Sequence, residues 1–223
     1  MCARYTMVTA ADELIEEFEA TLRVGELAPQ FNIAPTADAP IVVQTKEGER
    51  RLGLARFGLI PHWAKDARQG VKMLNARVET VATRSAYRVP FRRHRCLVVA
   101  DGFYEWERVG KEKLPHRFHL GGRPFGLAGL WSIWRDEDEQ KVSSFTILTR
   151  PAVGVTASIH DRMPILLPRR SYGAWLDRAP DTPLETLQAL LDDHTGEALE
   201  RTRVSKRVNF VRNDDPSLIE PVG

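Results

Sequence analysis

Short apolar runs of strand length, separated by turns that often contain glycine, occupy the middle of the chain. The first two runs flank a Lys-Glu-Gly turn, and this arrangement predicts a β-hairpin over residues 40–57. The runs that follow predict further strands at residues 96–100, 103–108, 116–120, 125–131, 143–149, 163–167 and 204–211. This density of strands predicts a core built mainly from sheet.

Apolar residues at helical spacing predict one N-terminal helix over residues 11–22, with Thr9–Asp12 as its capping box and Gly25 closing the segment. Shorter helices are predicted at residues 79–87, 172–176 and 184–191. For the last of these, Thr182 is expected to be the N-cap and Pro183 the first helical residue. Helices are therefore few and short beside the strands.

Regular periodicity disappears between residues 58 and 77, and a long irregular segment inside a compact domain is commonly functional. The chain has no internal repeat, linker or low-complexity tract, and its 223 residues can bury a substantial core. We therefore predict one domain over residues 1–223. Its fold class is α+β, with a curled, mostly antiparallel sheet or open barrel-like core and peripheral helices.

Charge and cysteine content exclude several classes of protein. The 32 Lys and Arg residues against 30 Asp and Glu residues leave a net charge of +2, so any basic surface must be local. Two cysteines cannot build a disulfide framework or a common zinc site, and His116 and His119 would point to opposite faces of a strand. We predict no metal, no cofactor and no membrane partner. Without a signal peptide or a long apolar span, we expect a cytoplasmic protein.

Cys2 is the first candidate for chemistry. Initiator methionine is usually removed when the second residue is small, so we expect the mature chain to begin with Cys2. Its α-amine would titrate near ~8 and its thiol near ~8.5, so both nucleophiles would be partly available at neutral pH. Such a 1,2-aminothiol can attack an aldehyde through nitrogen and then close through sulfur to a thiazolidine ring. A small residue at a frayed terminus is the simpler alternative.

Glu105 and His160 are candidate acid–base groups. In an extended strand Glu105 shares a face with Phe103 and Glu107, and flanking aromatic residues would desolvate its carboxyl and raise its pKa. A wet polar strand face is the alternative. His160 lies between a loop and an apolar strand, and an imidazole that titrates near ~6.5 could shuttle protons or make structural hydrogen bonds.

Asn75 and Arg77 share a face if their segment is extended. An amide can orient a reacting carbonyl, and a guanidinium binds two phosphate oxygens at once. Trp63 could stack on a base or anchor its loop. A local basic run, either a binding surface or an ordinary solvated one, consists of Arg88, Arg92, Arg93 and Arg95.

Seven motifs stand out by their order: Met1–Tyr5, Asn32–Pro35, Gly58–Lys65, Asn75–Thr80, Cys96–Trp106, Phe145–Thr149 and Ile159–Pro164. In sequence and spacing they closely resemble the SRAP family, the SOS-response-associated peptidase-like proteins that cross-link to abasic sites in single-stranded DNA. The resemblance is dense up to Pro168 and sparser up to Pro221. Ala3 and Tyr5 stand where the family usually has glycine and phenylalanine.

The resemblance implies a compact mixed α/β fold around a barrel-like sheet. It implies Cys2 as the cross-linking residue, and it places around Cys2 the residues Asn75, Glu105 and His160. It assigns contacts with DNA to Arg4, Trp63, Arg77 and Arg162. The partner would be single-stranded DNA with an abasic site, bound by a monomer that later releases itself by a lyase- or hydrolase-type reversal.

Two other classes of function stay open. One is a cysteine-type peptidase or amidohydrolase that uses Cys2, His160 and Asn75 for acyl transfer, including autoproteolysis. The other is a non-covalent single-strand binding module that uses Trp63 and the arginines. A DNA strand bearing an aldehyde separates the three, because only the cross-linking protein gives an adduct that survives denaturation.

Overall fold

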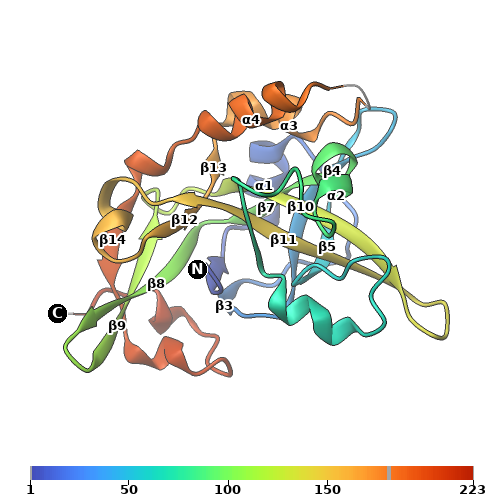
Figure 1. Ribbon diagram of the computed structural model, residues 1–223. Helices are drawn as coiled ribbons and strands as arrows, with labels where there is room; N and C mark the ends of the chain where they lie inside the picture. The colour runs from blue at the N-terminus through green and yellow to red at the C-terminus, as the bar shows by residue number, and fades with distance from the viewer. Residues whose placement is uncertain (1, 180–181, 223) are drawn as a thin grey trace.

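The computed structural model describes residues 2–179 and 182–222, without the side chain of Glu197. Its strands form two sheets. The first sheet is antiparallel throughout and contains, in spatial order, β14 (Glu200–Arg203), β9 (Glu112–His119), β8 (Gly102–Val109), β1 (Tyr5–Met7) and β3 (Gln30–Ile33). Figure 1 shows β8 and β9 as a long hairpin at the side of the molecule.

The second sheet has nine strands. Its main path is β12 (Arg162–Pro164), β11 (Lys141–Pro151), β10 (Phe125–Arg135), β7 (Arg95–Ala100), β4 (Asp38–Gln44), β5 (Arg50–Phe57) and β2 (Thr21–Leu22), while β13 (Leu166–Leu167) pairs with β10 and β6 (Asn75–Arg77) with β11. β5 also pairs with β11, which closes a ring through β10, β7 and β4. The prediction of an α+β fold with a barrel-like, mostly antiparallel core is confirmed.

Aromatic side chains fill the barrel where β5 meets β11. Phe57 and Phe145, which are partners in the parallel register of these strands, stack at 5.3 Å. Tyr5 meets the Phe57 ring edge-on at 5.5 Å, so β1 is packed against the barrel. The backbone of Ala3 lies outside the left-handed region, and therefore this position does not need the family's usual glycine.

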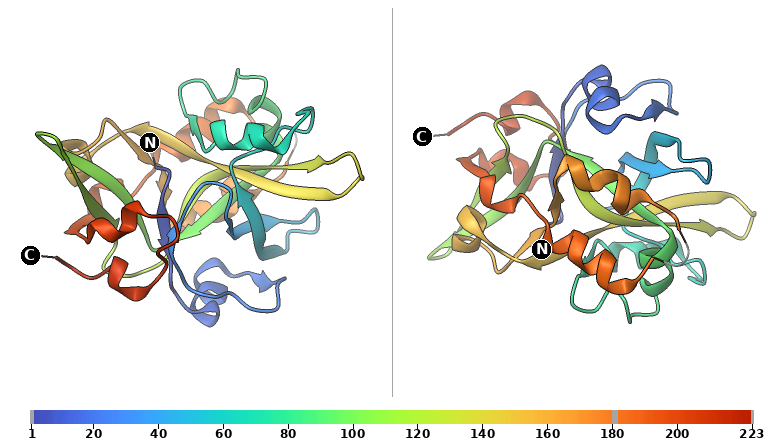
Figure 2. Two further views of the ribbon diagram at one scale, coloured as in Figure 1. Left: turned by 90° about the horizontal axis from the view of Figure 1, so that it is seen from below. Right: turned by 90° about the horizontal axis from the view of Figure 1, so that it is seen from above.

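The helices lie outside the sheets (Figures 1 and 2). They are α1 (Ala11–Phe18), α2 (Arg88–Arg93), α3 (Tyr172–Leu176) and α4 (Leu184–Asp192). Short 3-10 turns lie elsewhere along the described chain, at Ala67–Lys72, Gly154–Ser158, Arg169–Ser171, Gly196–Ala198, Lys206–Asn209 and Pro216–Leu218. Figure 2 shows the β10–β11 hairpin extending away from the other elements. None of the helices among the described residues combines the length and the apolar character that crossing a membrane requires.

A buried carboxylate holds the N-terminal strand to the first sheet. Asp101 accepts hydrogen bonds from the Thr6 hydroxyl at 2.6 Å and from the Val8 N–H at 2.5 Å, and it pairs with Arg117 at 2.9 Å. A Cβ on Gly102 would lie 2.4 Å from the Arg117 Nε. Glycine at this position therefore leaves the space in which the Arg117 guanidinium packs against the backbone. The cluster sets the position of the chain immediately after Cys2.

The N-terminal helix differs from its prediction. α1 ends at Phe18, Glu19 adopts a left-handed φ of 50°, and β2 pairs with β5 where the helix was expected to continue. The predicted capping box is also wrong. Ala10 is the N-cap, because the Thr9 hydroxyl and N–H instead bind Asp101 Oδ2, both at 3.1 Å.

Three other local predictions are wrong. Residues 79–87 form turns, and the helix that follows them contains Pro90 within its first turn, where a missing N–H costs little. Pro183 is the N-cap of α4, since the Thr182 hydroxyl binds the Ala179 carbonyl. The last strand lies at residues 200–203, and 206–209 is a 3-10 turn. The predicted hairpin, the strands from 96 to 167 and α3 are confirmed.

Candidate functional site

Cys2 lies fully buried just before β1, against the core. Its carbonyl accepts a hydrogen bond of 2.8 Å from the Asn75 side-chain amide, and its Sγ lies 4.0 Å from the Arg4 carbonyl. Burial, and after it the nearby Glu105 carboxylate, raise the pKa of the Cys2 thiol. The resting sulfur is therefore a neutral thiol.

Asn75 reaches Cys2 because β6 is added to the barrel at β11. Asn75 is the register partner of Ile147 in this parallel pair, and the Tyr87 hydroxyl donates to the Asn75 carbonyl at 3.4 Å. The Asn75 Oδ1 is buried and accepts no hydrogen bond from any described residue. The amide orientation is thus determined by its donation to Cys2, as expected of a group that orients a carbonyl.

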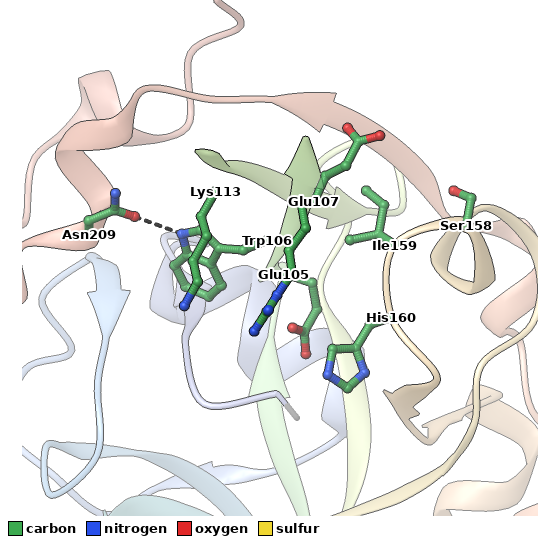
Figure 3. A pocket seen from close by; sticks show the side chains of 9 residues that line it. Glu105, Trp106, Glu107, Lys113, Ser158, Ile159, His160 and Asn209 are labelled. Atoms are coloured by element: carbon green, nitrogen blue, oxygen red, sulfur yellow. Dashed lines mark hydrogen bonds between the residues drawn. The ribbon is translucent and has the colours of Figure 1, made fainter. Parts of the chain in front are cut away.

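Glu105 is only 4% exposed, which rules out a wet strand face. It comes from β8, where its register partner on β9 is His116. Burial raises the pKa of the Glu105 carboxyl, and the charge of nearby His160 acts against that shift. Figure 3 shows the Glu105 carboxylate and the His160 ring side by side, each carried by a different segment of the chain. A carboxyl whose pKa is raised and that lies beside a histidine is suited to act as a general acid or base.

His160 follows the 3-10 turn Gly154–Ser158 and is partly exposed. Its Nδ1 lies 2.9 Å from the backbone N–H of Arg162 and 2.9 Å from Asp161 Oδ1. When Nδ1 accepts from the Arg162 N–H, the proton of the neutral ring is on Nε2. A proton on Nδ1 would instead pair with Asp161, and in either form these two contacts orient the ring.

Glu105 and His160 line a cavity of about 600 Å³. On its other side lie Trp106 and Lys113, and the Trp106 Nε1 donates to Asn209 Oδ1 at 2.6 Å (Figure 3). We call this the acidic cavity, after Glu105 and Glu107 in its wall. It offers an aromatic surface opposite the two candidate acid–base groups.

A second cavity of about 340 Å³ lies on the Asn75 side and is rich in cations. We call it the basic cavity, and its lining includes Lys72, Asn75, Arg77, Arg84 and Arg162. Asn75 and the arginines Arg77 and Arg162 are thus brought together, as the resemblance implies. Three guanidinium groups and an ammonium around one hollow suit phosphate oxygens.

Arg162 already has a carboxylate partner in this structure. Its two terminal nitrogens lie 2.5 and 3.0 Å from the two Glu79 oxygens, and it also donates to the Thr149 carbonyl at 2.6 Å. The hydrogen bonds from Arg162 lower the pKa of Glu79, so this carboxylate is ionised. We did not predict this pair, although Glu79 lies inside the Asn75–Thr80 motif.

Arg4 and Trp63 lie outside both cavities. The Arg4 guanidinium is buried and donates to Asn32 Oδ1 at 2.5 Å and to the carbonyls of Val208 and Asn209. Trp63 is 51% exposed on the irregular segment. In the basic run, Arg95 is buried on backbone carbonyls and is not part of a surface.

Comparison with known proteins shows the family to which the chain belongs. A family model described as SOS response associated peptidase (SRAP) matches residues 1–211. The abasic site processing protein YoqW of Bacillus subtilis (strain 168) is 37% identical over 224 residues, which cover 99% of each chain. The abasic site processing protein HMCES of Gallus gallus is 29% identical and covers 90% of this chain and 68% of its own.

Solved structures agree on the fold. A crystal structure of a protein from Bacteroides thetaiotaomicron covers 99% of this chain and 100% of its own, with a TM-score of 0.87 and 22% identity. A phage-related protein from Bordetella bronchiseptica covers 92% of this chain and 95% of its own, with a TM-score of 0.74 and 26% identity. The barrel with its added strands is therefore a recurrent fold.

Proposed function

Because the chain belongs to the SOS response associated peptidase (SRAP) family, we propose that it processes abasic sites, binding them in single-stranded DNA and joining them covalently to Cys2. Relatives that match the chain over almost its full length are named abasic site processing proteins. The observation that carries the proposal is the position of Cys2, which Asn75 holds between an acid–base pair and a cavity lined by cations.

The proposed reaction needs an α-amine on Cys2, and hence the removal of Met1, which lies outside the described residues. The amine attacks the aldehyde carbon of the ring-opened sugar, and loss of water gives an imine. The thiol then adds across the imine, sulfur to carbon and hydrogen to nitrogen, and a thiazolidine ring results. Aldehyde and aminothiol thus yield thiazolidine and one water, with no change of oxidation state.

Each neighbouring group has a role in this route. Asn75 fixes the Cys2 carbonyl, and so limits where the amine and thiol can lie. Glu105 removes protons from the attacking amine and helps water to leave, and in its protonated form it would assist ring opening in the reverse direction. His160 faces Glu105 and supplies the proton transfer that opens the closed hemiacetal of the sugar (Figure 3).

The buried thiol favours imine formation over acyl transfer. A cysteine peptidase attacks with a thiolate, and a thiol whose pKa is raised by burial is a poor source of one. In the imine route the amine attacks first, and sulfur reacts only after it has been placed beside an electrophilic carbon. The same residues therefore serve aldehyde capture better than peptide hydrolysis.

The basic cavity would bind phosphates beside the lesion, with Arg77 and Arg162 as principal ligands. Such contacts carry little sequence information, and an abasic site has no base to recognise. Added salt should weaken the first encounter but leave a completed adduct intact.

Intact-mass analysis of the protein, alone and after mixing with single-stranded DNA that contains an abasic site, tests the proposal. We expect a mass that lacks Met1, and an adduct equal to protein plus DNA minus one water. Cys2→Ala should form no stable adduct, since an amine alone gives a hydrolysable imine. Retention of Met1 in protein that still cross-links, or equal cross-linking of undamaged duplex, would refute the mechanism.

A further inference from the structure

The loop that follows the 3-10 turn Lys206–Asn209 turns its apolar side chains toward solvent. Phe210 is 71% exposed and Val211 is 58% exposed. An exposed aromatic ring offers a large apolar face on which another planar group can stack.

Two buried side chains hold the backbone of this loop. Arg4 donates to the carbonyls of Val208 and Asn209 at 3.1 and 3.2 Å. The Asn32 amide donates to the carbonyls of Phe210 and Asn213 at 3.2 and 2.8 Å. Hydrogen bonds from residues near the N-terminus therefore fix a loop near the C-terminus. The exposed ring is held on a rigid support, so little conformational entropy is lost when a ligand stacks on it.

The loop lies at the rim of the acidic cavity. Asn209 immediately precedes Phe210, lines that cavity and accepts the hydrogen bond from Trp106 (Figure 3). Glu105 lines the same cavity, so the loop and this candidate acid–base group border one space. A strand that leaves the site across Trp106 would meet this loop next.

The charges of the loop suit a polyanion. Arg212 is exposed and makes no ion pair with any described residue, and neither does Arg4 beneath the loop. Arg207 differs, because Asp215 neutralises it at 2.8 Å, and Lys206 lies 3.2 Å from Glu112. Arg4 is buried, so Arg212 is the exposed, uncompensated cation beside the exposed aromatic ring, and the nearby Asp214 accepts a hydrogen bond from the Phe31 N–H. An exposed ring with a cation beside it is the combination that binds single-stranded nucleic acid.

We propose that Phe210 is a stacking platform for a base that flanks the abasic site on one side, with Arg212 beside a neighbouring phosphate. The inference rests on the proposed function, and it extends the binding site beyond the lesion. Arg4 acts in it as a positioning residue, which holds the loop from below. Base stacking on an aromatic ring tolerates any sequence, as a lesion-binding protein requires.

The test compares Phe210→Ala with Phe210→Tyr, which keeps the ring, and with Val211→Ala, which trims an equally exposed neighbour. Binding is measured with single strands that carry a tetrahydrofuran abasic analogue, which has no aldehyde and cannot cross-link. The strands have bases on both sides, on the 5′ side only, or on the 3′ side only. A 2-aminopurine placed at each flanking position reports stacking by its fluorescence.

We expect Phe210→Ala to weaken binding of the full strand about tenfold, and to leave unchanged the binding of strands shortened on one side. Quenching of 2-aminopurine at one position on that side should be lost. Phe210→Tyr and Val211→Ala should match the parent. All variants should unfold at the parent's temperature, because both side chains are largely in water.

Three results would overturn the inference: unchanged binding of every strand by Phe210→Ala, an equal loss for all strand lengths, or failure of Phe210→Tyr to restore binding. The first would assign the exposed ring to a different partner, such as a protein. These outcomes are separate from failure of the proposed function, which would appear as a parent protein that forms no adduct with an aldehyde-bearing strand.

Discussion

Asn75 provides the sharpest test of how Cys2 is held. Its amide makes one hydrogen bond of 2.8 Å to the Cys2 carbonyl, in a partly buried position. A hydrogen bond of this kind contributes about 0.5–1.5 kcal/mol, and a buried carbonyl left without its donor costs about 1–3 kcal/mol. Asn75→Ala should therefore lower the free energy of unfolding by about 1 kcal/mol.

The same loss should slow adduct formation. If about 1–2 kcal/mol of positioning is lost from the transition state, the rate falls roughly 5- to 30-fold, since 1.4 kcal/mol corresponds to a factor of ten. Asn75→Asp should be slower still at neutral pH, because a carboxylate would then face the Cys2 carbonyl oxygen. As the pH falls, a protonated carboxyl regains an O–H donor, and the rate relative to the parent should rise.

The assay is a quenched time course of adduct formation between pH 5 and 8, with each variant divided by the parent at the same pH. The ratio removes the pH dependence that both proteins share. The ratio for Asn75→Ala should be flat, and that for Asn75→Asp should rise toward acid. A neutral-pH rate for Asn75→Asp equal to that of the parent would show that this hydrogen bond does not position Cys2.

Glu105→Gln should slow both adduct formation and release by about 10²- to 10⁴-fold, as followed by a time course and a chase with competing DNA. Burial raises the pKa of Glu105, so the parent's rate of adduct formation should fall as the pH drops through that raised pKa. The pH–rate profile of the variant should not show this acidic decrease. Glu79→Gln should tighten non-covalent binding of DNA and steepen the salt dependence of that binding, because it releases Arg162 in the basic cavity. The control Glu49→Gln removes the carboxylate partner of Arg51 on the surface and should change neither property. Asp101→Ala should destabilise the fold by about 3–5 kcal/mol in urea unfolding, because Arg117 would keep a buried charge without its partner; a loss below about 1 kcal/mol would contradict this account.

The two cavities together bear on the proposal that the DNA is single-stranded. Cations line the basic cavity, whereas the acidic cavity combines carboxylates and the Trp106 ring with Arg108 and Lys113. Phosphates are attracted to the first, while a sugar undergoing proton transfer needs the second. A paired second strand would have to be accommodated above both, and the aromatic side chains could not then meet unpaired bases.

Local sequence determined most of the strands and the identity of the residues gathered at the site. Apolar runs between glycine-containing turns predicted the β4–β5 hairpin and the strands from β7 to β12, because a strand buried on one face must carry apolar residues in short runs. The family motifs implied that Asn75 lies around Cys2, although 73 residues separate them, and in the structure the Asn75 amide donates to the Cys2 carbonyl. That the two residues act together stays a prediction.

Only the tertiary structure decided the properties that depend on distant partners. Thr9 does not cap its helix because Asp101, 92 residues away, binds it, and Arg4 reaches carbonyls more than 200 residues away instead of lying open to solvent. The burial of Glu105, and hence its raised pKa, likewise depends on what packs over its strand. Propensity and periodicity record the preferences of neighbouring residues, whereas burial and charge pairing arise only when the barrel closes and brings separate segments together.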